Sequence, residues 1–437
     1  MIGHRGYRWI TRLIIPLLPL YLLWRGRREP GYRRRWGERF GRVPATIAAG
    51  PIWIHAASMG EVQAVAPMLK ALLKRHPSQA ILITTTTPAG ATHVERLFDT
   101  QVQHCYLPFD APGPVSRFLG RVAPSLGLIV EMELWPNLFL QARAQGVPLM
   151  LINARLSERS ARRYARVRPL MARVLACPLR ITAQSHADAE RLRMLGAPEE
   201  RLAVTGSLKF DQTLPASTRE QGEALRRHIG ERRPVWIAAS TRDGEEQQVL
   251  KAHQRLRATL PDALLILVPR HPDRFTRVLR LCRDAGWQTT TRSSGAPVTS
   301  ATDVYLVDSL GELPMHYAAA DLAFVGGSLV PEGGHNLLEP ACLGKPIVVG
   351  PHTFNAPDMS RRLIDAGACV QVQTAAELGD VMRRLLTQPD QRADMGRAGE
   401  SLVSSNRGVG AQLLDDVERL ITNKTENPAA SATASDQ

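Results

Sequence analysis

The stretch GGSLVPEGGHNLLEPACLGKPIVVGP, residues 326–351, begins directly after the apolar run Leu322–Val325 and contains a second one, Ile347–Val349. This order predicts a strand, a glycine-rich loop, a helix from Asn336 to Cys342, and another strand. Two pairs of glycines let the loop backbone approach a bound group closely, and the first N–H groups of the predicted helix face the same place. A loop of this kind at the carboxyl end of a parallel strand is typical of phosphate sites. The stretch therefore predicts a doubly wound α/β domain that binds a nucleotide.

Glu339 lies about one turn into the predicted helix, where its carboxylate is placed to hold ribose hydroxyls. The glycine spacing is neither the P-loop pattern nor GxGxxG, which disfavours a P-loop NTPase and a Rossmann dehydrogenase. A loop that serves only as a tight connection is the alternative interpretation.

Short apolar runs alternate with helical patterns over most of the chain, as expected for parallel strands covered by helices on both faces. The first series of runs is Ile52–His55, Ile81–Thr85, His104–Leu107, Leu126–Val130, Leu149–Asn153, Arg180–Ala183 and Ala203–Thr205. The second series is Val235–Ala239, Leu264–Val268, Val304–Val307, Leu322–Val325, Ile347–Val349 and Ala368–Val372. Because 437 residues are too many for one core, the two series predict two Rossmann-like domains that face a central cleft.

The domain boundaries are predicted from where each series begins and ends. Residues 1–45 are an N-terminal anchor and basic segment, 46–205 the first domain, 206–232 a linker without a strand, 233–423 the second domain, and 424–437 a low-complexity tail that we expect to be disordered.

The cysteines and the charge exclude several classes of protein. Five widely spaced cysteines without a CxxC pair argue against a disulfide framework and a zinc site, and suit a reducing compartment. The net charge of +14 is concentrated in two patches: residues 1–42 carry eleven Arg against two Glu, and residues 155–168 carry six Arg against one Glu. The remainder is neutral, so the chain is not a uniformly basic nucleic-acid binder.

The first basic patch surrounds the apolar run Leu13–Trp24, which has twelve residues and two prolines. About 20 apolar residues are needed to cross a bilayer as a helix, so we expect a short signal anchor or a helix lying in the membrane interface. The flanking arginines mark the cytoplasmic side. A buried N-terminal helix beside a solvated basic stretch is the alternative.

Carboxylates and cations follow several of the predicted strands. In HAASMGE, residues 55–61, Glu61 is a candidate general base, although Ser58 and Glu61 also fit a capping box, in which the carboxylate only satisfies the Ser58 backbone N–H. EMELWPN, residues 131–137, carries two carboxylates, of which at most one faces a ligand. Lys209 in GSLKFD and Arg270 in VPRHPDRF are cations placed to meet a phosphate or a carboxylate.

The ordered set HAASMGE, TTTTPAG, YLPFD, EMELWPNL, NARLSERS, GSLKFD, PVWIAASTRDGEE, LILVPRHPDRF and GGHNLLEPA resembles the 3-deoxy-D-manno-octulosonic acid (Kdo) transferases of lipopolysaccharide synthesis. The resemblance covers roughly residues 5–420. HAASMGE differs from the commoner HxVSVGE form only in small neighbouring residues.

This resemblance implies a GT-B fold with an N-terminal acceptor domain and a C-terminal donor domain. It implies an inverting glycosyltransferase that uses CMP-Kdo and a lipid A precursor (lipid IVA), without a cofactor or metal, on the cytoplasmic side of the inner membrane. The proton acceptor is then Glu61, and the transition-state partners are Glu131 and Lys209. The CMP contacts implied are Pro269, Arg270, Leu310, Gly311, Glu312, Asn336, Leu337, Leu338 and Glu339.

The second basic patch places Arg155, Arg159, Arg162, Arg163 and Arg166 at helical spacing, so several share one face. That face is suited to lipid phosphates; a solvated charged helix is the alternative.

Two other functions stay open at this point. One is a different GT-B enzyme, a UDP-sugar transferase or epimerase, and the other is a non-enzymatic protein that docks on anionic membrane or nucleic acid. The number of Kdo residues transferred and the oligomeric state do not follow from the sequence.

Overall fold

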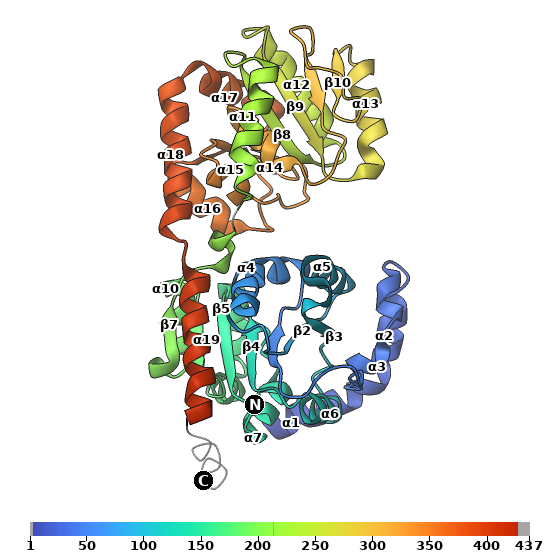
Figure 1. The fold of residues 1–437 in the computed structure, drawn as a ribbon, viewed down its shortest axis with the longest axis vertical. Helices are drawn as coiled ribbons and strands as arrows, with labels where there is room; N and C mark the ends of the chain where they lie inside the picture. Colours follow the sequence, from blue (N-terminus) through green and yellow to red (C-terminus); the bar gives the residue numbers. More distant parts are fainter. Residues whose placement is uncertain (1–2, 213, 427–437) are drawn as a thin grey trace. The chain divides into compact units, whose positions relative to one another are not determined.

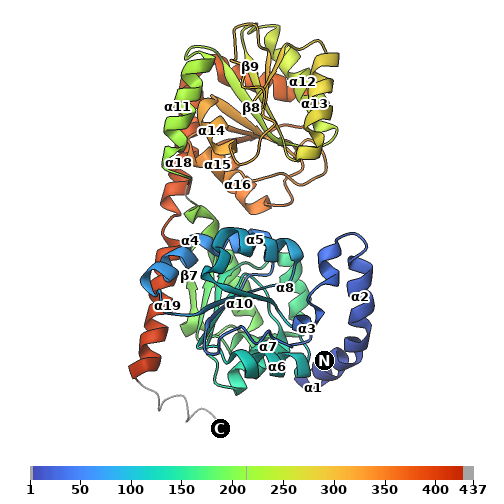
Figure 2. The same cartoon turned by 45° about the vertical axis from the view of Figure 1, so that its right-hand side comes forward.

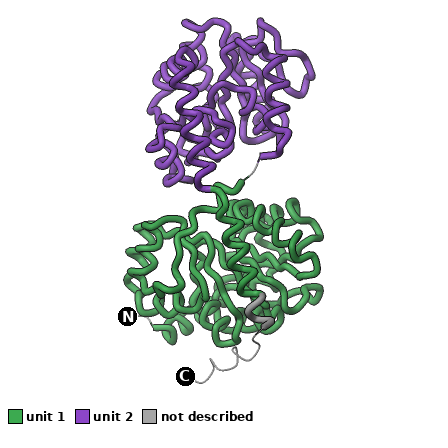
Figure 3. The backbone as a smooth tube through the Cα atoms, turned by 60° about the vertical axis from the view of Figure 1, so that its left-hand side comes forward, with its two compact units in different colours: residues 1–212, 407–437 green, residues 213–406 purple. Residues whose placement is uncertain are grey.

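The computed structural model describes residues 3–212 and 214–426, with the side chains of residues 422–426 excepted. The chain divides into two compact units (Figure 3): unit 1 comprises residues 1–212 and 407–437, and unit 2 residues 213–406. Each unit is built on one seven-stranded sheet, and every strand pair in both sheets is parallel.

The sheet of unit 1 has the order β3-β2-β1-β4-β5-β6-β7. Its strands are β1 (Ile52–His55), β2 (Ile81–Thr85), β3 (Gln103–Tyr106), β4 (Leu126–Val130), β5 (Leu149–Ala154), β6 (Arg180–Ala183) and β7 (Leu202–Val204). The helices around it are α4 (Met59–Arg75), α5 (Pro88–Phe98), α6 (Pro112–Val122), α7 (Pro136–Ala144), α8 (Glu158–Ala165), α9 (Arg168–Leu175), α10 (His186–Leu195) and α19 (Val409–Glu426). Both faces of the sheet are buried: Trp53 packs in one core cluster, and Ile52 and Ile54 pack in the other.

The sheet of unit 2 has the order β10-β11-β9-β8-β12-β13-β14. Its strands are β8 (Val235–Thr241), β9 (Leu264–Pro269), β10 (Thr289–Thr291), β11 (Val304–Leu306), β12 (Leu322–Val325), β13 (Ile347–Val349) and β14 (Cys369–Gln371). The helices are α11 (Ser217–Ile229), α12 (Glu245–Arg257), α13 (Phe275–Asp284), α14 (Leu313–Ala319), α15 (Leu338–Cys342), α16 (Pro357–Asp365), α17 (Ala375–Thr387) and α18 (Pro389–Ser405) (Figure 1).

The strand order reverses at the centre of each sheet, between β1 and β4 in unit 1 and between β8 and β12 in unit 2. Ligands of open α/β sheets bind outside the carboxyl ends of the strands at such a switch point. The segments that follow these four strands are therefore where functional side chains are expected in each unit.

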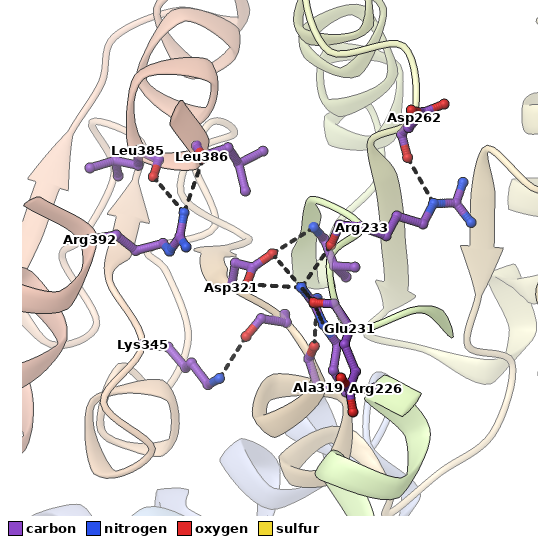
Figure 4. A network of polar contacts seen from close by, with 12 residues as sticks. Arg226, Glu231, Arg233, Asp262, Ala319, Asp321, Lys345, Leu385, Leu386 and Arg392 are labelled. Carbon is purple, nitrogen blue, oxygen red and sulfur yellow. Dashed lines mark hydrogen bonds and ion pairs between the residues drawn. The ribbon is translucent and has the colours of Figure 1, made fainter. Parts of the chain in front are cut away.

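A half-buried polar network lies at the opposite end of the unit 2 sheet, where its strands begin (Figure 4). Asp321 accepts from the backbone N–H of Val235 at 2.8 Å and from the Arg226 guanidinium at 3.1 and 3.2 Å. Lys345 donates to the carbonyls of Ala318 and Ala320 at 2.9 and 2.7 Å, and burial lowers its pKa to about 8. These contacts connect the starts of β8, β12 and β13. They lie at the end of the sheet opposite the carboxyl ends of the strands, where ligands are expected.

Two predicted boundaries differ from the structure. The linker predicted at 206–232 contains α11, which packs on α14 within unit 2. Residues 407–423, predicted to end the second domain, belong to unit 1, because Val409, Leu413 and Val417 of α19 join the core cluster that contains α4. Residues 424–426 of the predicted disordered tail are the end of α19, and residues 427–437 lie outside the described residues.

The N-terminal apolar segment forms two helices rather than one. α1 (His4–Ile14) and α2 (Leu18–Arg25) are joined by a 3-10 turn, with a proline near the start of the turn and another near the start of α2. α1 contacts α6 at the side of unit 1 (Figure 2). Across residues 3–212 and 214–426, no helix has both the length and the apolar character needed to cross a membrane.

Candidate active site

Glu61 lies in the first turn of α4, directly after the switch-point strand β1. The Ser58 hydroxyl caps α4 and accepts the Glu61 N–H at 3.4 Å. The Glu61 carboxylate accepts from the Ser58 hydroxyl at 2.9 Å and from the Ala57 N–H at 2.8 Å. The capping-box prediction is thus correct in outline, but the backbone donor is Ala57 rather than Ser58.

The carboxyl of Glu61 has an unusual proton affinity. Burial, and after it the nearby charge of Glu131, raise its pKa to about 7, against the opposing effects of the hydrogen bonds from Ala57 and Ser58 and of His55. A carboxylate whose pKa lies near neutral pH has the property that a general base needs. A cap alone does not require that property.

Glu131 follows β4, the other switch-point strand of unit 1. Its φ of 59° is left-handed, a conformation that costs free energy in a residue other than glycine and that is frequent at functional sites. The Lys209 ammonium lies 3.7 Å from a Glu131 carboxylate oxygen. Lys209 is positioned by Asn153 at the end of β5, whose side-chain oxygen accepts the Leu208 N–H at 3.0 Å. Glu61, Glu131 and Lys209, distant in sequence, therefore gather at one edge of unit 1.

Glu133 is a third carboxylate at this edge that the sequence prediction did not single out. Its carboxylate lies 3.7 Å from Nε2 of the buried His55 and accepts from the Trp135 indole at 2.9 Å. Burial alone would raise the pKa of Glu133, but His55 and Trp135 together hold it below its ordinary value. In EMELW the two carboxylates are separated by one residue. With this spacing Glu131 lies near Lys209 and Glu133 lies near His55.

In unit 2, the glycine loop after β12 is occupied by a side chain of the protein. The fully buried Glu245, first residue of α12, accepts the N–H groups of Gly327, Ser328 and Leu329 at 2.7, 3.1 and 2.9 Å. It also accepts the Arg242 N–H at 3.1 Å. The predicted phosphate site therefore does not include the N–H groups of residues 327–329, because a carboxylate of α12 already holds them.

The predicted helix from Asn336 begins two residues later, as the five-residue α15. The Asn336 side chain accepts the Leu338 N–H at 3.1 Å and donates to the Glu339 carboxylate at 3.1 Å. Burial raises the pKa of Glu339, against the opposing effects of Asn336 and the Arg270 charge. Leu337 and Leu338 are buried.

The remaining predicted nucleotide contacts follow β9 and β11. Pro269 ends β9, and the exposed Arg270 is fixed through its backbone N–H, which donates to the Thr241 carbonyl at 3.0 Å. Leu310 is exposed, Gly311 has a left-handed φ of 86°, and Glu312 pairs with Arg292 at 2.8 Å. These residues thus share with Asn336 and Glu339 the carboxyl edge of the unit 2 sheet.

None of the five cysteines forms a disulfide. Within the described part of the chain, no group of three or more His, Cys, Asp or Glu side chains is arranged to hold a metal ion.

The chain has two doubly wound units, and the candidate site residues of each lie at the carboxyl ends of the strands of a parallel sheet. This arrangement is typical of the GT-B class of α/β proteins. The fold is similar to the UDP-GlcNAc 2-epimerase of Neisseria meningitidis, with a TM-score of 0.56 and 16% identity over 85% of this chain and 100% of that chain. Residues 34–212 match the family model described as 3-deoxy-D-manno-octulosonic-acid transferase.

Relatives extend this match over nearly the whole chain. It is 39% identical over 411 residues to the 3-deoxy-D-manno-octulosonic acid transferase of Haemophilus influenzae, covering 93% of this chain and 96% of that protein. It is 40% identical over 430 residues to the enzyme of the same name from Bordetella pertussis, covering 95% and 99%. The chain belongs to the 3-deoxy-D-manno-octulosonic acid transferase family.

Proposed function

We propose that this protein transfers Kdo from CMP-Kdo to the lipid A precursor lipid IVA, with inversion at the anomeric carbon. The observation that carries the proposal is the identity of about two residues in five, over nearly the full length, to transferases named for Kdo. Unit 1 is proposed to bind the acceptor and unit 2 the CMP moiety. The reaction is proposed to need no cofactor and no metal.

The side chains of unit 1 fit the acceptor half of this reaction. The acceptor hydroxyl must lose a proton as it attacks, and Glu61 is the group proposed to take it. The Lys209 ammonium and the Glu131 carboxylate, 3.7 Å apart, are proposed to stabilise the charge that develops in the transition state. In unit 2, the proposed CMP contacts are Pro269, Arg270, Leu310, Gly311, Glu312 and Asn336–Glu339.

We expect kcat/KM to fall about tenfold for each pH unit below about 7. The pKa of Glu61 is raised to about 7, and only its ionised form accepts a proton, so protonation at lower pH removes the base. Rates measured over a pH series test this, with CMP binding measured over the same series as the control for changes in unit 2. A rate that stays flat down to about pH 5.5 would contradict the role of Glu61.

Glu339→Ala is expected to weaken CMP binding by about tenfold to 100-fold, or about 1.4–2.8 kcal/mol. The reason is the half-buried position of Glu339, hydrogen-bonded to Asn336 and within the field of the Arg270 charge, where it is proposed to hold ribose hydroxyls. Titration calorimetry with CMP measures the effect, and Glu220→Ala, at an exposed site on α11, is the control. Equal CMP affinity in both variants would remove Glu339 from the site.

We also propose that α1 and α2 lie in the interface of the inner membrane on its cytoplasmic side. Their lengths of 11 and 8 residues fit this geometry better than a signal anchor, since a span needs about 20. Several of their large apolar side chains are exposed, including Trp9 at 64%, Leu13 at 73%, Leu20 at 63% and Trp24 at 57%. Exposed Trp and Leu beside arginines are typical of interfacial helices.

Replacing Trp9, Leu13, Leu20 and Trp24 together with Ser is expected to abolish most sedimentation with anionic vesicles. This variant is a cleaner test than deleting residues 1–24, because deletion also removes the fully buried Leu22. The control replaces Leu179 and Met194, which are exposed elsewhere on unit 1. Vesicle binding equal to wild type would overturn the proposal for α1 and α2.

The exposed arginines of α8 are proposed to bind the phosphates of the acceptor. Arg159, Arg162 and Arg163 are exposed, and the 3.3 Å pair of Arg162 with Glu158 is solvated on both sides. Gln substitutions at these positions should raise the acceptor KM and weaken its salt dependence. An unchanged KM would assign them to a solvated helix face.

A donor screen tests the proposed function against the other GT-B activities. CMP-Kdo, UDP-GlcNAc and UDP-glucose are each incubated with the protein and lipid IVA, with and without EDTA. Of the three donors, we expect only CMP-Kdo to be turned over. EDTA should not affect the release of CMP. Turnover of a UDP-sugar instead would favour a UDP-sugar transferase or epimerase, and turnover of none would favour a docking protein.

A further inference from the structure

Arg242 lies on the turn between β8 and α12, at the carboxyl edge of the unit 2 sheet. Its guanidinium is held between two imidazoles: Nε donates to Nε2 of His335 at 3.3 Å, and a terminal nitrogen donates to Nε2 of His271 at 2.6 Å. Within the described residues, its carboxylate partner is Glu332, at 3.9 Å and itself half exposed. The Arg242 side chain is partly shielded, with 26% of its surface exposed.

Other shielded arginines of unit 2 are neutralised more closely. Arg274 pairs with Glu246 at 2.6 Å, and Arg226 pairs with Asp321 at 3.1 Å. Arg242 instead donates to imidazoles that must be neutral in order to accept, so they offer no counter-charge. Burial, followed by the charges of Arg270 and Arg242, lowers the pKa of His335 to about 4, which agrees with its acceptor role. A shielded guanidinium without a close carboxylate is a position where an anion gains free energy by binding.

Contacts with the backbone hold Arg242 and His335 in place. One buried carboxylate, Glu245, accepts the Arg242 N–H and the Gly327 N–H, which fixes the turn below Arg242 relative to the glycine loop. The His335 ring packs over Gly327 so closely that a Cβ there would lie 3.1 Å from Nε2. Because Glu245 also holds the next two loop amides, the N–H groups of residues 327–329 are not available to an anion.

We propose that Arg242, with His335 and His271, forms a subsite for an anionic oxygen of the nucleotide-sugar donor. The oxygen belongs either to the phosphate of the CMP moiety or to the carboxylate of the sugar acid. This assignment rests on the proposed function, and it makes Arg242 a donor-binding residue beside Arg270 and Asn336.

Arg242→Gln, Arg242→Lys and wild type are titrated with cytidine, CMP and CMP-Kdo. Arg277→Gln, on the exposed side of α13, is the control for the loss of one positive charge. We expect Arg242→Gln to lower the affinity for the anionic ligands by roughly tenfold to 100-fold. The affinity for cytidine should not change, and the melting temperature should stay near that of wild type. Arg242→Lys should recover part of the affinity, because it keeps the charge.

The ligands separate the two sources of the anion. Weaker binding of both CMP and CMP-Kdo assigns Arg242 to the phosphate, and weaker binding of CMP-Kdo alone assigns it to the sugar carboxylate. The proposed subsite is wrong if wild type and Arg242→Gln bind all three ligands with equal affinity. It is also wrong if Arg242→Gln loses as much affinity for cytidine as for CMP and CMP-Kdo. A wild-type protein that binds neither CMP nor CMP-Kdo would contradict the proposed function itself.

Discussion

Glu61→Gln is expected to lower turnover by roughly 10²–10⁴, the usual contribution of a general base. Gln keeps the size of the side chain and can still accept from Ala57 or Ser58, but it cannot take a proton. The pKa of Glu61, raised to about 7 by burial and by Glu131, is the property that this substitution removes. Turnover of lipid IVA with CMP-Kdo measures the effect.

A second capping box in the same chain supplies the control. Thr374 caps α17, and Glu377 accepts the Gln373 N–H at 2.7 Å from an exposed position. If Glu61 were only a cap, Glu61→Gln and Glu377→Gln would be equally silent. Near-wild-type turnover in both variants would return Glu61 to a structural role and leave Glu131 as the next candidate base.

Glu245→Gln is expected to destabilise unit 2 by about 2–4 kcal/mol. Each carboxylate oxygen of Glu245 accepts two backbone N–H groups, and Gln offers only one oxygen. Its NH₂ group would face two buried donors that then have no acceptor, and each such orphan costs about 1–3 kcal/mol. Calorimetric melting should show the transition of this unit lowered by roughly 5–15 °C.

Glu377→Gln again serves as the control, since it lies in the same unit but is exposed, and it should change stability by less than about 0.5 kcal/mol. A melting temperature of Glu245→Gln within error of that control would mean that the carboxylate does not hold the glycine loop. CMP binding by the folded fraction then shows whether the loop geometry also affects the donor site.

The central strands of both sheets, β1, β2, β4, β5, β8, β9, β12 and β13, were predictable because each is buried on both faces and therefore appears as a continuous apolar run. β10 was missed because its three threonines are only half-buried, at the edge of the sheet. The unit to which α19 belongs was also missed. Its apolar spacing predicts a buried face, but nothing local indicates that the face packs on α4, more than 300 residues earlier.

The candidate site was predictable where function depends on local motifs. Glu61, Glu131 and Lys209 follow strand ends that topology brings to one edge of unit 1. The loop was different: its glycines predicted close approach by a ligand, whereas the group that approaches is Glu245, 82 residues from Gly327. A single sequence shows that a loop can hold an anion, but not that the protein supplies the anion itself.

Mass spectrometry of lipid IVA after incubation with this protein and CMP-Kdo tests whether the protein transfers Kdo with Glu61 as the proton acceptor. We expect the acceptor to gain the mass of one or more Kdo residues with wild type and with Glu377→Gln, and to remain unmodified over the same time with Glu61→Gln. An unmodified acceptor with wild-type protein that binds both substrates, or equal product with Glu61→Gln, would contradict the account.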